Sequence, residues 1–474
     1  MSKSLSDRFG ELFRLKDVPF MGVPDYMFNI EHWLGGVAAS ALAWQAITGL
    51  LLLLYYQPSN AYDSTMAIIH NVPFGSILLS SHLYGAYIMI LAVYLHGLYI
   101  MISGGYKKPR GVQWVLGVLL FAMTLGVAFI GYSMTGDVLA ADAVDVGRGI
   151  LTSLGLQSLA PVLFGNGTTL DLFTRLLGWH IIIAAAIILF FVIHFYLAEA
   201  VGLMPRLKDA NYKAPAVLDK ATVKDPWWPR NFVYMIALAF MVWGVILLLP
   251  SILALPSVYP YVPVLFSPYP GPSPTSPQAA LVPAYPPWFF LMLYKMADMP
   301  LGLRNNMLLG AIVPLVILLL IPIFDRGEKL HPMDRPAILA LALIGLTWLI
   351  ELSSWSAIQP GIPVQPLWGA IVLLPPLLII VAGIYLLHRQ WLKVRDRALA
   401  RREEAAKTPW ALSSAGAQAL AYLTAVLAII MIGLSFVLDP LSEGPYIGIL
   451  WGAAFLSLSA SIYNYFYITY ILNK

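Results

Sequence analysis

Two apolar stretches decide the fold: residues 78–103, LLSSHLYGAYIMILAVYLHGLYIMIS, and residues 174–201, TRLLGWHIIIAAAIILFFVIHFYLAEAV. His82 and His96 lie in the first stretch, and His180 and His194 lie in the second, each pair 14 positions apart. At about 1.5 Å per residue, 14 residues nearly complete four helical turns and rise about 21 Å. Each stretch is therefore predicted to be a helix with both histidines on one face, one near each side of a membrane.

The repeated spacing predicts cofactor binding. If the two helices face each other, His82 meets His180, and His96 meets His194. Neutral imidazole is a common axial ligand of haem iron, so the pattern predicts two non-covalent haems, each held by two histidines. One such histidine alone is equally compatible with a hydrogen-bonded packing role. Ionisable residues inside a bilayer are costly and usually functional, however, and here the spacing occurs twice.

The composition indicates an integral membrane protein. Only 11% of the 474 residues are charged and 59% are hydrophobic, whereas soluble domains carry about 25% charged residues. The chain has no cysteine, which excludes disulfides, iron–sulfur ligation within the chain and thioether-linked haem. The net charge of +4 gives no indication of nucleic-acid binding. Residues 1–27 lack the apolar core and cleavage site of a removable signal.

Ten apolar runs are long enough to cross a hydrocarbon core of about 30 Å. They cover residues 33–55, 78–103, 112–134, 174–201, 231–254, 305–324, 336–355, 366–388, 411–438 and 445–471. The expected fold is an all-α membrane protein whose first four spans form a bundle around two haems.

Loop charges predict the orientation. The loops at 104–111, 202–230 and 389–409 are basic, and the alternating loops at 56–77, 135–173 and 255–304 are poor in Lys and Arg. The basic residues are Lys107, Lys108, Arg110, Arg206, Lys208, Lys213, Lys220, Lys224, Arg230, Arg389, Lys393, Arg395, Arg397, Arg401 and Arg402. Both termini are thus expected in the cytoplasm. We call His82 and His180 the outer pair, and His96 and His194 the inner pair.

Two outer loops are long, and long loops are often functional, although a spacer role stays open. Residues 135–173 contain Asp137 in a stretch expected to form a short interfacial helix, and residues 255–304 are rich in proline. The Arg- and Glu-rich run at 389–409 is interpreted as a solvated linker.

Glycines repeat at the same pitch as the histidines. Gly35 and Gly49 lie 14 apart in the first span, and Gly117 and Gly131 lie 14 apart in the third. Glycine lets a backbone approach a flat ligand closely, so these helices are expected to press against the porphyrins. Small-residue helix packing is the alternative for either pair alone.

The chain resembles cytochrome b of the Rieske–cytochrome b quinol oxidoreductases over residues 20–355. The histidine and glycine pairs carry the resemblance. So do Tyr55-Tyr56-Gln57-Pro58 after the first span and Thr169-Leu170 with Arg175 before His180. It divides the chain into a dihaem domain at 1–230, a quinol-site domain at 231–360 and additional helices of unassigned role at 361–474.

The resemblance implies a mechanism and partners. Quinol is oxidised at an outer site with a Rieske iron–sulfur partner. Electrons cross through the two haems, expected to be b-type, to an inner quinone, and protons are translocated. The family assembles as dimers, and other respiratory-chain subunits are expected partners, with a terminal oxidase as a further candidate. This chain is expected in a prokaryotic plasma membrane. The outer-site segment corresponds to Pro286-Pro287-Trp288-Phe289, with Tyr132 nearby. Arg175 is a haem-binding candidate, and Glu199 and Asn231 fall near the inner site.

Several positions depart from the family pattern. Pro287 replaces the usual glutamate, so another proton acceptor is required: Asp137 is the first candidate and Asp298 the second. Leu79 and Tyr99 stand where arginines often neutralise haem propionates, which leaves Arg175, Lys107 and Lys108 as substitutes.

Two other functions stay open from the sequence alone. A dihaem anchor with a single quinone site would keep the histidines but would not need the Pro-rich outer loop. A secondary transporter would fit ten interrupted spans. A haem spectrum and copurification with a Rieske protein discriminate among the three.

Overall fold

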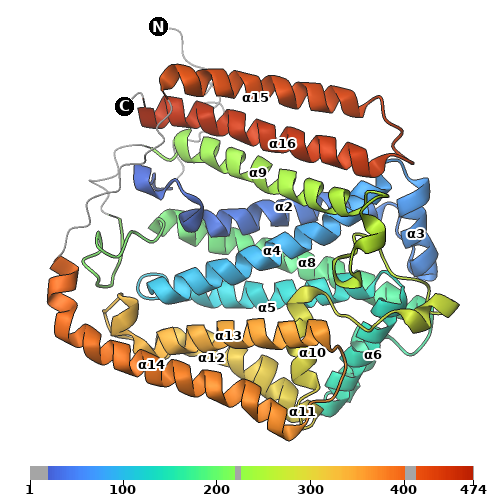
Figure 1. Cartoon of the computed structure of the whole chain (residues 1–474), viewed down its shortest axis with the longest axis horizontal. Coiled ribbons are helices and arrows are strands. Elements are labelled where there is room, and N and C mark those ends of the chain that lie inside the picture. Colours follow the sequence, from blue (N-terminus) through green and yellow to red (C-terminus); the bar gives the residue numbers. More distant parts are fainter. Residues whose placement is uncertain (1–19, 219–225, 401–412, 473–474) are drawn as a thin grey trace.

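The computed structural model describes residues 20–218, 226–400 and 413–472. In these ranges the structure is helical apart from one isolated β-bridge between Lys213 and Lys329 (Figure 1). Lys220, Lys224, Arg401, Arg402 and most of the stretch inspected for a signal lie outside the described residues. The longer helices are α2 (Leu34–Leu53), α3 (Ala61–Asn71), α4 (Gly75–Ser103), α5 (Gly111–Ser133), α6 (Val138–Ser153), α8 (Thr169–Val201), α9 (Arg230–Leu253), α12 (Val313–Phe324), α13 (Pro336–Ile358), α14 (Pro366–Ala400), α15 (Ser414–Ser435) and α16 (Gly444–Tyr467).

Short helices connect these elements. They are η2 (Asp25–Met27), η3 (Ile30–Trp33), η4 (Pro58–Asn60), η5 (Gln157–Leu159), α7 (Ala160–Phe164), η6 (Tyr259–Tyr261), η7 (Val264–Phe266), η8 (Pro277–Leu281), η9 (Trp288–Phe290), α10 (Leu291–Ala297), α11 (Leu303–Met307), the π-turn η10 (Leu308–Ile312), η11 (Pro332–Asp334) and the π-turn η12 (Ile468–Leu472). Within the described ranges, ten helical segments are long and apolar enough to cross a membrane, and they correspond one for one to the ten predicted spans.

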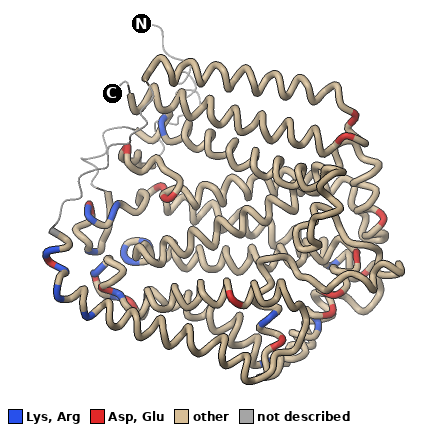
Figure 2. The backbone as a smooth tube through the Cα atoms, in the orientation of Figure 1, with Lys and Arg blue, Asp and Glu red and all other residues tan. Residues whose placement is uncertain are grey.

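The first four spans form the predicted bundle. α2 packs along α4, and α5 packs along α8, so each histidine-bearing helix lies against a glycine-bearing helix. Charged residues are sparse along the middle of the spans, and Lys and Arg gather at the end of the bundle where the N- and C-terminal labels lie (Figure 2). This clustering agrees with the loop charges that the sequence places on one side.

A buried ionic cluster joins the first half of the chain to the second. Lys107 donates to the Asp325 carboxylate at 2.6 Å and to the Gly327 carbonyl at 2.5 Å. Tyr106 also donates to Asp325, and Arg335 donates to the Tyr106 hydroxyl. Lys107 is therefore engaged in joining the α4–α5 and α12–α13 loops.

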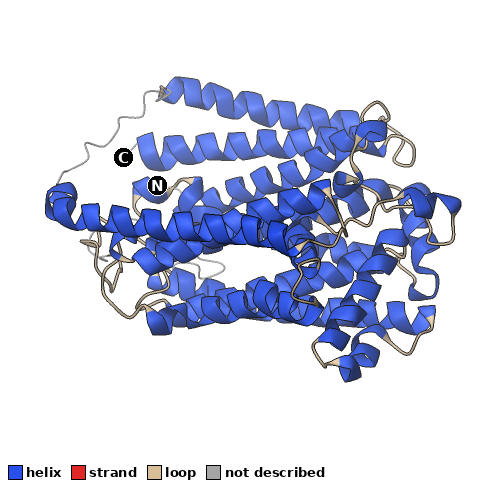
Figure 3. Ribbon diagram, turned by 60° about the horizontal axis from the view of Figure 1, so that its bottom comes forward, coloured by secondary structure: helices blue, strands red, loops and turns tan. Residues whose placement is uncertain are grey.

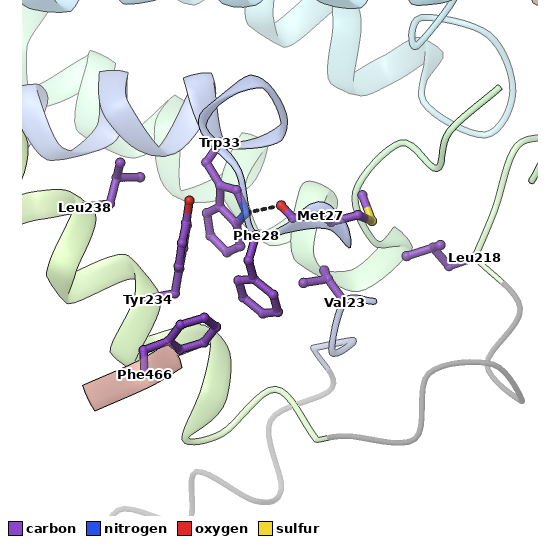
Figure 4. Packing of buried hydrophobic residues seen from close by; sticks show 8 residues of the cluster. All are labelled: Val23, Met27, Phe28, Trp33, Leu218, Tyr234, Leu238 and Phe466. Carbon is purple, nitrogen blue, oxygen red and sulfur yellow. Dashed lines mark hydrogen bonds between the residues drawn. The ribbon is translucent and has the colours of Figure 1, made fainter. Parts of the chain in front are cut away.

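The start of the first span is anchored by an apolar cluster at the same end (Figure 4). Trp33 Nε1 donates to the Met27 carbonyl at 2.8 Å, and Trp33 packs on Tyr234 of α9. Phe466 of α16 packs on Phe28 of the same cluster. The last helix thus contributes to the core that holds the beginning of the haem half.

The last three spans lie on two flanks. α14 packs on α13, whereas α15 packs on α16 and α16 packs on α9. Figure 1 shows α14 along the lower edge and α15 along the upper edge, and Figure 3 again shows α14 apart from α15. The helices at 361–474 therefore do not gather into one bundle of their own.

Close backbone approach explains the contact between α9 and α16. A Cβ on Gly244 would lie 2.9 Å from the carbonyl oxygen of Gly452, and a Cβ on Gly452 would lie 2.8 Å from the backbone nitrogen of Leu248. Membrane helices associate through such small residues because lipid offers no hydrophobic driving force.

The charged run at 389–409 was predicted to be a linker, and this prediction is wrong for its first part. Residues 389–400 continue α14 instead of forming a linker. Arg, Gln, Leu, Lys and Ala in this run favour helix. Tertiary contacts also hold the extension, because Trp391 and Arg395 both donate to the Asp334 carboxylate in η11.

Candidate functional site

The structure brings the histidines together in the two predicted pairs. The ring centroids of His82 and His180 are 6.5 Å apart, and those of His96 and His194 are also 6.5 Å apart. Two metal–nitrogen bonds of about 2.0–2.1 Å, together with about 1 Å from each ring centre to its nitrogen, span about 6 Å. Each pair is therefore spaced to hold one metal ion between the rings.

Hydrogen bonds orient the outer pair. Thr48 Oγ1 lies 2.8 Å from Nδ1 of His82, and the carbonyl oxygen of Val127 lies 3.1 Å from Nδ1 of His180. Occupying Nδ1 in this way fixes the tautomer and leaves Nε2 to bind a metal. Gln45 adds a hydrogen bond from its amide to the backbone carbonyl of His82 at 2.7 Å.

Each of the four glycines faces one histidine ring. If each glycine carried a Cβ, we can compare the distance from that Cβ to Cε1 of the opposing imidazole. This distance is 3.3 Å for Gly49 and His82, 2.8 Å for Gly131 and His180, 3.2 Å for Gly35 and His96, and 3.2 Å for Gly117 and His194. The close contact is thus with the imidazole ring, and it is tightest at Gly131, where the ring would have to move to admit a Cβ. The sequence predicted close approach but assigned it to the porphyrin.

A cavity of ≈ 900 Å³ contains the outer pair and most of the predicted outer site. Tyr132, Asp137, Pro286, Pro287 and Phe289 line it together with both histidines, Gly49, Gly131, Leu79 and Tyr56. Ligand sites commonly measure about 300–1,000 Å³, so the space suits large ligands. Trp288 instead packs against Tyr87 and Tyr94, at ring-centroid distances of 6.4 and 6.5 Å.

The two candidate proton acceptors have different surroundings. Asp137 is 2% exposed and lines the cavity. Burial raises the pKa of its carboxyl, and this effect exceeds the opposite effect of the hydrogen bonds that the carboxylate accepts. Asp298 forms an ion pair with the fully buried Lys295 at 3.1 Å, and burial raises its pKa. It is not among the residues that line the cavity. Asp137 is therefore the better placed of the two.

The candidate counter-charges for haem propionates are mostly engaged elsewhere. Arg175 pairs with Asp171 at 2.9 Å, and Lys107 pairs with Asp325. Lys108 is exposed. Tyr99 has its hydroxyl 3.1 Å from Nδ1 of His32, and both line a second pocket of ≈ 300 Å³ with Arg206. Sequence reasoning missed this pocket, because its residues come from four separate segments.

The inner-site candidates lie where α8 ends and α9 begins. Glu199 is 6% exposed and accepts a hydrogen bond from Trp227 Nε1 at 2.7 Å. Asn231 is fully buried, and neither atom of its amide has a hydrogen-bond partner among the described residues. Buried polar groups are rarely left unsatisfied, so the Asn231 amide is available to a bound molecule. Trp227 was not predicted.

The most informative relative is a protein named cytochrome b from Sulfolobus acidocaldarius. It is 42% identical over 404 residues, which cover 81% of this chain and 70% of the relative. The chain belongs to the cytochrome b family. As a family member it is a multi-pass membrane protein of electron transport, and the family implies a haem cofactor.

Other cytochrome b proteins match parts of the chain. The family described as cytochrome b(N-terminal)/b6/petB matches residues 87–274. Cytochrome b6 of Heliobacterium modesticaldum is 33% identical over 42% of this chain and 97% of its own length. The menaquinol:cytochrome c reductase cytochrome b subunit of Bacillus subtilis is 33% identical over 40% of this chain and 84% of its own.

A solved chain of a hyperthermophilic respiratory Complex III has a similar fold. Its TM-score is 0.60 at 19% sequence identity, over 84% of this chain and 100% of that chain.

Some residues of the site could not have been found from the sequence. Thr48 lies one position before Gly49, but only the fold shows that it faces His82. Gly271 and Tyr285 act through backbone atoms, which leave no signature in a sequence.

Proposed function

We propose that this chain is the dihaem cytochrome b subunit of a quinol:acceptor oxidoreductase. Quinol is oxidised in the outer cavity with a Rieske iron–sulfur partner, electrons cross the membrane to a quinone at the inner side, and protons are translocated. The observation that carries this proposal is the pair of equal 6.5 Å separations, one at each end of the same two helices.

The residues fit two haems. His82 with His180 would hold one and His96 with His194 the other, as bis-histidine axial ligands. No group of three or more His, Cys, Asp or Glu able to hold a metal ion occurs within the described ranges, so a metal here needs the further nitrogen atoms that a porphyrin supplies. When bound, the haems would accept and pass on one electron at a time.

The chain's residues would prepare the outer site for quinol. Apolar walls contributed by Pro286, Pro287 and Phe289 keep the cavity dry, and Tyr132 and Asp137 add polar groups. Quinol oxidation releases two protons and two electrons. Because Pro287 cannot accept a proton, we assign one proton to the Asp137 carboxylate, which general-base catalysis requires within reach of the substrate.

The inner site would use Glu199 and Asn231. A quinone carries two carbonyl oxygens that accept hydrogen bonds, and the Asn231 amide has an N–H to donate. Its reduction consumes two protons, and the buried Glu199 carboxyl is positioned to deliver one. Glu199 lies five residues beyond His194 on α8, so both groups belong to the inner end of the same helix.

Assembly and orientation complete the proposal. We assign both termini to the cytoplasmic side of a prokaryotic plasma membrane because the basic loops gather there. We assign residues 1–230 to the dihaem domain, residues 231–360 to the quinol-site domain and residues 361–474 to additional helices. The expected partners are a Rieske protein, other respiratory-chain subunits (a terminal oxidase among the candidates) and a second copy of the chain.

Three measurements on the protein purified from its native membrane test this function. We expect two haems per chain by absorption spectroscopy, haem reduction by quinol when the inner site is inhibited, and a copurifying Rieske protein. Two haems without a Rieske protein would instead indicate a dihaem anchor with one quinone site. A chain without haem bands would overturn the proposal.

A further inference from the structure

Asp137 joins three segments of the outer side. Its Oδ1 accepts a hydrogen bond from the backbone N–H of Ala140 at 2.9 Å and from the Thr135 hydroxyl at 3.0 Å. Its Oδ2 accepts the backbone N–H of Gly271 at 2.5 Å. The first bond caps the N-terminus of α6. The Gly271 bond reaches 134 residues along the chain to the Pro-rich loop.

The Pro-rich loop forms one wall of the outer cavity. Its residues Val264, Tyr269 and Gly271 line the same space as the outer histidines. We call residues 264–285 the roof segment. Three side chains hold the roof segment. Tyr84 of α4 donates to the Phe266 carbonyl at 2.6 Å, and Tyr132 of α5 donates to the Tyr285 carbonyl at 2.9 Å. Asp137 binds Gly271, which lies between these two points in the sequence.

The Asp137 contact differs from the two tyrosine contacts because it involves a carboxylate. Hydrogen bonds to charged groups are roughly twice as strong as those between neutral groups. A second bond at the same place, from the Val138 N–H to the Pro272 carbonyl at 3.0 Å, aligns the start of α6 with the roof segment. The roof segment carries no charged residue that could hold Asp137 in another way.

We propose that Asp137 is a positioning residue that holds the roof segment over the outer cavity and thereby sets the shape of the quinol site. This inference rests on the proposed function, because it assigns quinol to that cavity. It adds a second role to the proton-accepting role assigned above. Among the described residues, Oδ2 accepts a hydrogen bond from Gly271 alone, so the same carboxylate has a lone pair left for a proton.

Two substitutions separate the positioning role from the proton-accepting role. Gly271→Pro removes the roof N–H. Gly271→Ala keeps the N–H and adds a Cβ at the same place, which would lie 3.1 Å from Asp137 Oδ2 and crowd the carboxylate. The difference between the two variants therefore isolates the N–H. Gly271 lies between Pro270 and Pro272, and its backbone is not in the left-handed region. Asp137→Asn removes the charge but retains an oxygen for capping α6.

The measurements are the KM and kcat of quinol-dependent haem reduction. We expect Gly271→Pro to raise the KM about tenfold with both haems bound, the size expected when a hydrogen bond to a charged group is lost. Gly271→Ala, which crowds the carboxylate but keeps the N–H, should raise the KM clearly less than Gly271→Pro does. Asp137→Asn should raise the KM similarly and also lower kcat. A Gly271→Pro protein with a wild-type KM would overturn the positioning role while leaving the proposed function intact.

Hydrogen exchange provides a readout that does not depend on activity. In Asp137→Asn and in Gly271→Pro, backbone amides of the roof segment should exchange at least about tenfold faster than in wild type, while those of α4 and α8 stay unchanged. Unchanged protection of the roof segment in both variants would contradict the inference. Absence of quinol-dependent reduction in the wild type, with faster exchange in the variants, would count against the proposed function alone.

Discussion

The hydroxyl of Thr48 lies 2.8 Å from Nδ1 of His82 and 2.7 Å from the carbonyl oxygen of Trp44. The carbonyl can only accept, so the hydroxyl donates to it and accepts from the imidazole. His82 is thereby held as the tautomer that carries its proton on Nδ1, which leaves Nε2 unprotonated. A single hydroxyl group on α2 thus fixes the tautomer of a histidine on α4.

Replacing this hydroxyl is expected to change the outer haem only. Thr48→Val removes the acceptor at nearly constant volume, so His82 becomes a weaker base and a less electron-donating ligand. Outer-shell partners of this kind typically contribute about 10–100-fold in metal affinity. We expect looser outer haem and a higher midpoint potential for it in redox titration, with the inner haem unchanged. Thr48→Ser is the control that should restore both properties.

Removing individual histidines should remove individual haems. His82→Ala or His180→Ala is expected to abolish the outer haem, and His96→Ala or His194→Ala the inner one, because each leaves one axial position unfilled. The haem-to-protein ratio of purified variants measures this. His70, exposed on α3, provides a control substitution. If His180→Ala retained two haems, the pairing would be wrong.

The four glycines should differ in their tolerance of alanine. A Cβ at Gly131 would lie 2.8 Å from the His180 ring, closer than carbon atoms can pack, whereas a Cβ at Gly49 would lie 3.3 Å from the His82 ring. We expect Gly131→Ala to lower outer haem occupancy and Gly49→Ala to preserve it, with overpacking typically costing about 1–3 kcal/mol. Leucine at either position should exclude the haem. Equal occupancy in all of these variants would assign the glycines to helix packing alone.

Asp298 is expected to act on stability more than on quinol chemistry. Asp298→Asn leaves the Lys295 ammonium, which is fully buried, without its carboxylate partner. Removing one partner of a buried pair typically costs about 3–5 kcal/mol. The variant should therefore unfold at a lower temperature, while the quinol oxidation rate of the folded fraction stays near wild type. A slower rate with unchanged melting would instead favour Asp298 as the proton acceptor.

Acidification is expected to release the inner end of α14 only at low pH. Burial disfavours the charge on Asp334, but hydrogen bonds from Trp391 and Arg395 prevail and hold its pKa below the ordinary value of 3.8. The contact is therefore fully stabilising above pH 3.8 and is lost as the pH falls through the lowered pKa. Amides of residues 388–399 should stay protected from exchange at pH 5 and lose protection below pH 3.8. In Asp334→Asn they should exchange faster already at pH 7.

Helical periodicity explains which parts of the fold could be predicted. Hydrophobic runs located all ten spans, because each span must present apolar side chains around most of its circumference. The spacing of 14 located the histidine pairs, since it is nearly a whole number of turns. The segment around Pro286 lines the same cavity as the outer histidines, and its role in quinol binding stays a prediction.

What the sequence did not reveal depends on backbone atoms and on contacts between distant segments. The roof segment is held through carbonyl and amide groups of Phe266, Gly271 and Tyr285, and any residue type offers these groups. The continuation of α14 past residue 388 depends on Asp334, which lies in another loop. The separation of α14 from α15 and α16 has no local signal, because all three are simply apolar runs.

The seam between α9 and α16 has a consequence for how the protein is made. Until α16 enters the membrane, the face of α9 around Gly244 has only lipid against it, and Phe28 lacks its contact with Phe466. A ribosome-bound intermediate that ends after α14 would therefore expose the entry of the first span to lipid. Haem would then be inserted into an incompletely packed bundle. The last helix completes the packing of spans that entered the membrane before it.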